Sequence, residues 1–345
     1  MKLLCSLAVV VSSMVASSLA SAQEVTLKAH TLVPAMATGV AKLLNPWCET
    51  LAKNSGGRIK CQVYPSMQLG GTPPQLYDQV KDGVVDVIWT LPGYTAGRFP
   101  ASEVFELPFM TRTAQGSSRA LWEYVVANNL LATEYRDVKP IAFHVHDEGY
   151  IHTIARQVRT LADFKGLKLR APTRLTNRML AAFGATPVGM PVPQVPEALS
   201  KGVIDGAVVP WEIVPSIKVH ELVKFHTETD PKSRALYTSV FIVAMNKAKY
   251  DALPPDLKKV IDANSGAATS QWIGRTWDES AAPARKLAEA RGNTFYTVPA
   301  AELASWEKAA QPVYDEWIRD VGAKGLNGAA LLKNAKDLIL QYDGR

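Results

Sequence analysis

Two arginines near the end of a predicted strand have the side chain best suited to hold an anion. Arg170 closes the segment 167–170, whose apolar residues alternate, and Pro172 follows closely. A guanidinium presents paired N–H donors that match the two oxygens of a carboxylate. Arg174 stands just before a predicted helix, where it either shares such a carboxylate or faces solvent. For Arg170 itself, the alternative role is that of a surface or ion-paired arginine.

Apolar and aromatic residues are candidates for the rest of a binding pocket. They stand beside predicted strand ends or in loops between apolar elements: Trp89, Tyr94, Met190, Val209 and Trp211. Ordinary core packing is an equally good role for each of them taken alone. Together they predict an apolar, aromatic-lined pocket above one carboxylate clamp. Glu212 faces either solvent or the far polar end of a ligand, and both roles stay open.

Neighbouring histidines raise the alternative of a metal-dependent enzyme. His144 and His146 fall on one face of a predicted strand, where Asp147 or Glu148 could complete a metal site. No convincing further ligand follows at a regular spacing. We therefore expect one histidine to be packed and His146 to form hydrogen bonds at a cleft. The sequence also lacks GxSxG, HExxH, CxxC, P-loop and GxGxxG motifs, so we expect no enzymatic activity, no metal and no cofactor.

The elements that position Arg170 form an α/β unit. The segment 161–211 predicts a strand–helix–strand–helix–strand order, with strands at 167–170, 186–188 and 206–209. Units of this size form parallel sheets, which bind ligands at the carboxyl ends of their strands. Arg170 is expected at such an end.

A short internal repeat favours two lobes built alike. The segment 81–86 recurs in outline at 200–205, and each copy follows a helix opened by prolines and precedes an apolar strand. A chain of 345 residues is long enough for two domains. We predict an α/β fold of two lobes with a ligand cleft between them.

The lobe boundaries follow from the strands expected to cross between them. Lobe I is predicted to comprise residues 23–145, with 236–275 returning to it. Lobe II is predicted to comprise 146–235, with 276–345 packing on it. A long helix over 265–291 should lie along both lobes and should be kinked or split at Pro283.

Composition and the first residues of the chain bear on location and partners. Hydrophobic residues make up 47% of the chain and charged residues 20%, with a formal net charge of +6 and no run rich in lysine and arginine. This pattern is that of a globular protein and gives no case for nucleic-acid binding. Residues 1–22 have the pattern of a secretory signal cleaved after Ala22, which predicts export to the periplasm.

Cys48 and Cys61 remain once that signal is removed. In an oxidising compartment this pair could form a disulfide between the first helix and the following strand. Two buried thiols are the alternative, because the sequence supplies no geometry. We favour the disulfide.

Several segments resemble those of TRAP transporter substrate-binding proteins of the DctP-like family, the periplasmic receptors of tripartite ATP-independent transporters. The segments occur in the family's order and run over nearly the whole mature chain: TLKAHTLVP, YPSMQLGG, GRFPASEVFELPF, KGLKLRAP, GATPVGMPVP, KGVIDGAVVPWE and AMNKAKYDALPPDLKKVID. The resemblance implies a two-lobed periplasmic binding protein fold with a long helix spanning both lobes. It also implies that Arg170 holds the ligand carboxylate and that membrane subunits are the partners.

One departure from the family pattern bears on the ligand. Many members that bind sugar acids or dicarboxylates have an asparagine where Val209 stands, and here Trp211 follows. We therefore expect a hydrophobic or aromatic monocarboxylate as the ligand. We also expect the receptor to be a monomer. A C4-dicarboxylate or sugar-acid receptor, or an ABC-type binding protein, remains the alternative, and a metal-dependent enzyme is the least favoured.

Overall fold

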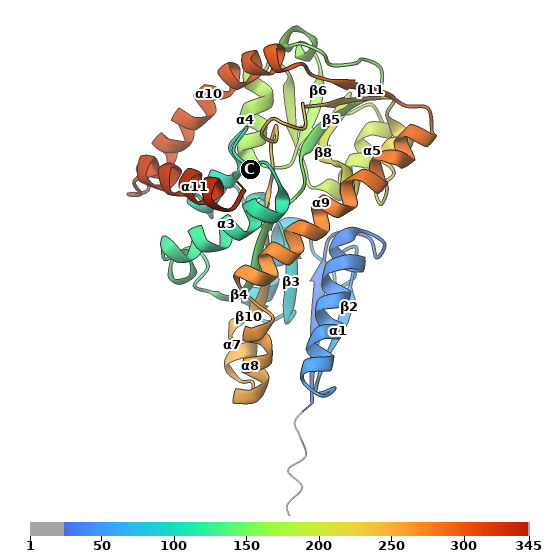
Figure 1. The fold of residues 1–345 in the computed structure, drawn as a ribbon. Helices are drawn as coiled ribbons and strands as arrows, with labels where there is room; N and C mark the ends of the chain where they lie inside the picture. Colours follow the sequence, from blue (N-terminus) through green and yellow to red (C-terminus); the bar gives the residue numbers. More distant parts are fainter. Residues whose placement is uncertain (1–23, 344–345) are drawn as a thin grey trace, which may run out of the picture.

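The computed structural model describes residues 24–343, which form two α/β lobes, each built on its own sheet (Figure 1). Lobe I has the strand order β2-β1-β3-β10-β4, and lobe II has the order β11-β9-β5-β8-β6-β7. The strands of lobe I are β1 (Val25–Thr31), β2 (Ile59–Tyr64), β3 (Val87–Thr90), β4 (Val138–Val145) and β10 (Val240–Asn246). Those of lobe II are β5 (Gly149–Thr153), β6 (Lys168–Ala171), β7 (Thr186–Gly189), β8 (Gly206–Pro210), β9 (Phe225–Glu228) and β11 (Thr294–Thr297).

Helices cover both sheets. The longer ones are α1 (Asn45–Asn54), α3 (Ala114–Ala127), α4 (Arg174–Ala182), α8 (Pro255–Ala263), α9 (Ala267–Ala290), α10 (Ala300–Gly322) and α11 (Gly328–Asp343). The shorter ones are α2 (Leu76–Lys81), α5 (Val195–Ser200), α6 (Val219–Leu222) and α7 (Lys247–Asp251). Within residues 24–343, no helix is long and apolar enough to cross a membrane.

The short sequence repeat corresponds to a structural repeat. The order β1-α1-β2-α2-β3 in lobe I recurs as β6-α4-β7-α5-β8 in lobe II, and in each lobe the first strand lies between the other two in parallel. The Asp86 carboxylate accepts a hydrogen bond from the backbone N–H of Lys28 at 2.8 Å, and that of Asp205 accepts one from Lys168 at 2.7 Å. Each lobe therefore has an aspartate directly before its third strand that is hydrogen-bonded to the first strand.

Three segments connect the lobes before the C-terminal helices. The chain leaves the lobe I sheet after Val145 and enters lobe II at Gly149, and it returns over residues 229–239 between β9 and β10. Helix α9 then runs diagonally across both lobes (Figure 1). It continues through Pro283 as one helix, so the split predicted at this proline as one of two outcomes does not occur.

The C-terminal helices do not both pack on lobe II as predicted. Helix α10 packs on α4 of lobe II, whereas α11 lies against α3 of lobe I (Figure 1). The Asp343 carboxylate at the end of α11 accepts a hydrogen bond from the backbone N–H of Thr113 at 2.9 Å, directly before α3. The apolar stripe of α11 predicts that one face is buried, but it does not specify against which lobe.

Cys48 of α1 and Cys61 of β2 form a disulfide, with their Cα atoms 5.7 Å apart. The bridge joins the first helix to the edge strand of lobe I, the placement that the sequence favoured. Neither cysteine lines the cavity between the lobes.

Candidate functional site

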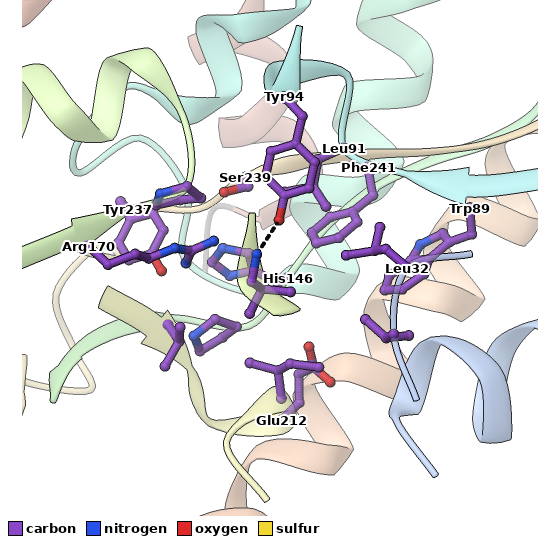
Figure 2. Close-up of a pocket in the computed structure, with 16 residues that line it drawn as sticks. Leu32, Trp89, Leu91, Tyr94, His146, Arg170, Glu212, Tyr237, Ser239 and Phe241 are labelled. Carbon is purple, nitrogen blue, oxygen red and sulfur yellow. Dashed lines mark hydrogen bonds between the residues drawn. The ribbon is translucent and has the colours of Figure 1, made fainter. Parts of the chain in front are cut away.

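A cavity lies between the two lobes (Figure 2). Its walls are mostly apolar and come from both lobes: Leu32, Val33, Trp89, Leu91, Tyr94, His146, Arg170, Pro172, Val192, Val209, Pro210, Glu212, Ile213, Tyr237, Ser239 and Phe241. A largely apolar cavity with a few convergent polar groups is the usual form of a small-molecule site.

Arg170 is the cationic group of the cavity and stands near the carboxyl end of β6. Only 2% of the residue is exposed. Its Nε donates to the carbonyl of Met190 at 2.9 Å and its Nη1 to the carbonyl of Val208 at 3.0 Å. These two bonds hold the guanidinium in one orientation at the cavity wall (Figure 2). No carboxylate of residues 24–343 forms an ion pair with it, which leaves a buried positive charge without a counter-ion.

Two hydroxyl groups stand with Arg170 at the cavity, and sequence reasoning missed both. Tyr237 and Ser239 are buried, and within the described part of the chain neither hydroxyl has a hydrogen-bond partner. Buried hydroxyls left unpaired are costly, so these two are available to a ligand bound beside the guanidinium. They come from the segment that returns to lobe I. The one sequence signal for them was the expectation that this segment crosses the cleft.

Burial and the charge of Arg170 set the protonation states of the titratable groups beside it. Burial raises the pKa of Tyr94 and Tyr237 and lowers that of His146 to about 4. The positive charge of Arg170 lowers the pKa of all three groups, and for the two tyrosines burial outweighs it. Two phenols and a neutral imidazole therefore surround the guanidinium.

His146 lies in the cavity wall, as expected, at the start of the first crossing between lobes. Its Nδ1 is hydrogen-bonded to the carbonyl of Asp147. A carbonyl only accepts, so this nitrogen carries the proton and Nε2 is an acceptor. Among the described residues no cluster of His, Cys, Asp and Glu is arranged to hold a metal.

Aromatic rings form one side of the cavity. Trp89 stacks on Phe241 with ring centroids 5.0 Å apart and an interplanar angle of 5°. The Trp89 Nε1–H donates to Nε2 of His144 at 2.8 Å, and burial lowers the pKa of His144 to about 3. The indole N–H is thus satisfied by a neutral histidine in the core, while the ring forms part of the cavity wall. Phe241, a strand residue of β10, was not among the sequence candidates.

Arg174 does not share the cavity with Arg170. It pairs with Glu103 of lobe I and with Asp320 of α10, and it is absent from the cavity wall. The prediction that it shares the ligand carboxylate does not match this placement, because two acidic groups brought by other elements already hold it. Its pair with Glu103 connects the lobes beside the cleft.

Trp211 and Met190 also lie outside the cavity wall, whereas Val209 lies in it. Trp211 packs against His152 and His226, and its Nε1–H donates to Glu228 at 2.8 Å. The strand alternation that would align it with Val209 ends at Pro210, because Trp211 begins a 3₁₀ turn. Met190 acts instead through its backbone carbonyl, which orients Arg170.

Acidic groups stand apart from Arg170 at the cavity. Glu212 is 7% exposed and lines the wall, and its Oε2 has no partner within residues 24–343. Figure 2 shows its carboxyl group well separated from the guanidinium. Asp147 is its buried neighbour. Burial raises the pKa of both carboxyls, and the charge of Glu212 raises that of Asp147 further.

The lobes meet over the cavity. The Tyr94 hydroxyl, on the loop after β3 in lobe I, accepts a hydrogen bond from the backbone N–H of Val192 in lobe II at 3.0 Å (Figure 2). Nearby, a Cβ placed on Gly93 would lie 2.6 Å from Cγ2 of Thr173, so the backbone of one lobe touches a side chain of the other. The structure therefore represents the closed form of the cleft.

Two α/β lobes that close over a buried arginine define a solute-binding protein, and comparison with known families agrees. The family model described as "Bacterial extracellular solute-binding protein, family 7" matches residues 30–320. The chain belongs to this family. It is a periplasmic receptor of a TRAP transporter, not an enzyme. Its class binds small carboxylates and works with membrane subunits.

Solved structures of related receptors cover nearly the same length. A TRAP solute-binding protein from Rhodoferax ferrireducens, solved with copurified benzoate, is 51% identical, with a TM-score of 0.91 over 93% of this chain and 99% of that one. A marine metagenome TRAP protein specific for aromatic acids, solved with 3-hydroxybenzoate, is 50% identical, with the same TM-score and the same coverage of both chains. A periplasmic TRAP protein from Bordetella bronchiseptica with bound mandelate is 29% identical, with a TM-score of 0.85 over 92% and 99% of the two chains.

Proposed function

We propose that this receptor captures an aromatic monocarboxylate. The observation that carries the proposal is the buried guanidinium of Arg170, which has no ion-pair partner in the described chain and faces a cavity walled by Trp89 and Phe241. The carboxylate would pair with the guanidinium and the ring would lie against the indole and phenyl groups. Benzoate and 3-hydroxybenzoate in the two receptors about half identical to this chain support this ligand class.

The clamp consists of one charge and three neutral groups. Arg170 supplies the charge-assisted hydrogen bonds, and the hydroxyls of Tyr237 and Ser239 donate to the remaining lone pairs of the carboxylate. The phenol of Tyr94 completes the clamp from lobe I. Because Arg170 is buried, this ion pair is stronger than it would be in water, and removing one partner leaves an uncompensated buried charge.

Closure couples binding to transport. The ligand contacts groups from both lobes, so it favours the closed arrangement by its differential affinity for that state. The membrane subunits can then distinguish a loaded receptor from an empty one by its shape.

The test is calorimetric titration of the unfolded-and-refolded, ligand-free protein with benzoate and with succinate. We expect benzoate to bind with micromolar affinity or better, and succinate to show no detectable heat. Arg170→Gln should reduce benzoate affinity by at least about 100-fold, since a charged hydrogen-bonding partner is lost. Arg275→Ala, which changes an arginine with a 55% exposed side chain on α9, is the matched control and should bind normally. Succinate binding without benzoate binding would refute the proposal.

Two further parts of the proposal concern the mature protein. We propose that cleavage follows Ala22 and that the receptor is a monomer; residues 1–23 lie outside the described residues. Intact mass of the exported protein tests the cleavage site. Light scattering with and without benzoate tests the monomer.

A further inference from the structure

We propose that Glu212 determines which ring substituents the receptor accepts, admitting a hydroxyl group and rejecting a second carboxylate. The inference deepens the proposed function and depends on it. It concerns the side of the cavity away from Arg170, which the carboxylate clamp does not use.

Glu212 stands across the cavity from Arg170. Glu212 lines the cavity, is 7% exposed, and has an Oε2 without a partner in the described part of the chain. In Figure 2 its carboxyl group and the Arg170 guanidinium lie on separate sides of the enclosed space. A ligand held at Arg170 by its carboxylate would therefore extend its ring toward Glu212.

The carboxyl group of Glu212 can pair with a polar substituent on the ring. Among the polar side chains that line the cavity, Glu212 is the one that Figure 2 shows away from the groups gathered at Arg170, and its Oε2 is available to a polar substituent. Thr38 and Trp277 are its neighbours on the protein side. A carboxyl oxygen accepts from a ring hydroxyl in either protonation state. A buried oxygen that lacks a partner favours the ligand that supplies one, because the unpaired state is costly.

The surroundings of Glu212 disfavour a second carboxylate on the ligand. Glu212 lies beside Asp147, whose two carboxyl oxygens also lack hydrogen-bond partners among residues 24–343. The cation acting on Glu212 is Lys42, which is exposed and donates to Ser280 at 2.9 Å. A second ligand carboxylate would join two buried carboxyl groups with no buried cation facing it. Such a site rejects dicarboxylates because the second carboxylate would lose its water without gaining a cation.

The experiment uses ligands that differ only at the ring. The ligand-free protein is titrated with benzoate, 3-hydroxybenzoate, 4-hydroxybenzoate, isophthalate and terephthalate. In the wild type we expect one hydroxybenzoate isomer to bind about tenfold tighter than benzoate, the effect of one additional buried hydrogen bond. Both dicarboxylates should bind at least about 100-fold more weakly than benzoate, since the second carboxylate is neither paired nor solvated.

Two substitutions separate the two effects. Glu212→Met removes the polar group, so the affinity for each hydroxybenzoate should fall to within about twofold of that for benzoate in the same variant. Glu212→Gln keeps the shape and replaces one carboxyl oxygen with an amide N–H donor, so dicarboxylate affinity should rise about tenfold or more relative to benzoate. Glu148→Gln is the control: Glu148 is a half-buried acid one residue beyond Asp147, hydrogen-bonded to Tyr150 and Thr229 and outside the cavity wall. It should leave every ratio unchanged.

The outcomes distinguish the inference from the function on which it depends. Wild-type ratios that persist in both Glu212 variants would overturn the role of Glu212 and leave the aromatic-acid receptor intact. Failure of the wild type to bind benzoate or either hydroxybenzoate would overturn both. The ratios are measured within one protein, so a general loss of stability in a variant does not imitate either effect.

Discussion

The hydroxyl of Tyr94 in lobe I accepts a hydrogen bond from the backbone N–H of Val192 in lobe II at 3.0 Å. The same phenol lies within the electrostatic reach of Arg170 and lines the cavity. One side chain thus belongs both to the carboxylate clamp and to the contact between the lobes. Ligand binding and closure are thereby joined at a single residue.

Tyr94→Phe should shorten the lifetime of the complex. The variant keeps the ring and removes the bond between lobes, whose loss is worth about 1 kcal/mol, or about fivefold in affinity. The effect should appear as faster benzoate release, because interface changes act mainly on dissociation. Stopped-flow measurement of association and dissociation tests this. An unchanged dissociation rate would show that the bond does not hold the closed state.

Tyr237→Phe and Ser239→Ala should each weaken benzoate binding by about tenfold. Each removes one hydroxyl that has no other partner in the described chain and that we place on the ligand carboxylate. The ligand-free variants should be as stable as the wild type or slightly more stable, because an unpaired buried hydroxyl is removed. Calorimetric titration and thermal melting measure the two effects. Loss of stability without loss of affinity would contradict the clamp.

Arg174→Met should lower stability without changing ligand preference. It leaves Glu103, whose side chain is 5% exposed, without its cation. We expect a loss of about 1–3 kcal/mol in the free energy of unfolding, reduced by solvent at the partly exposed arginine. Arg178→Met is the matched control, since Arg178 pairs with Glu316 and Asp320 on α10 and has a more exposed side chain. Denaturant unfolding compares the stability of the two variants. A change in the order of ligand affinities in Arg174→Met would show that Arg174 acts in the binding site.

His226 should make the protein sensitive to acid. Its Nδ1 lies 2.6 Å from Nδ1 of His152, and burial, together with the charges of His152, Arg285 and His220, lowers its pKa to about 2. The unfolded histidine binds a proton below about pH 6.5, whereas the folded one does not until near pH 2. The stability contributed by this group is therefore complete above pH 6.5 and is lost as the pH falls below it.

The measurement is the free energy of unfolding from pH 7 to pH 5 in the wild type and in His226→Asn. Buried carboxyls with raised pKa values, such as Glu106 at about 8, act in the opposite direction but are common to both proteins. The slope of the variant should therefore differ by up to one proton, about 1.4 kcal/mol per pH unit. Equal slopes would show that His226 is protonated in the folded protein.

Removal of the Cys48–Cys61 disulfide should destabilise lobe I and leave binding intact. The bridge closes a loop with a sequence separation of 13, which corresponds to about 2–3 kcal/mol in the chain-entropy account. The double variant Cys48→Ala/Cys61→Ala should unfold at lower denaturant concentration with its benzoate affinity unchanged. A fall in affinity would mean that the bridge also shapes the cleft.

Much of the fold could be predicted locally. Prolines before helices α2 and α5, glycines after them and the apolar strands that follow are signals within a few residues, and the strands β3 and β8 fall where these signals place them. Arg170 could be singled out for the same reason. It ends a strand in a parallel α/β unit, and strand ends in such units converge on a ligand site.

The composition of the cleft was decided by tertiary structure. Val209 lines the cavity and Trp211 does not, because the chain turns at Pro210 and breaks the alternation. Arg174 is close to Arg170 in sequence but belongs to the contact between lobes, since Glu103 and Asp320 arrive from distant parts of the chain. Tyr237 and Ser239 are polar residues without local signals of binding, and for Glu212 the sequence left two roles open. Their role depends on which groups surround them, and that is a property of elements packed together, which no local pattern encodes.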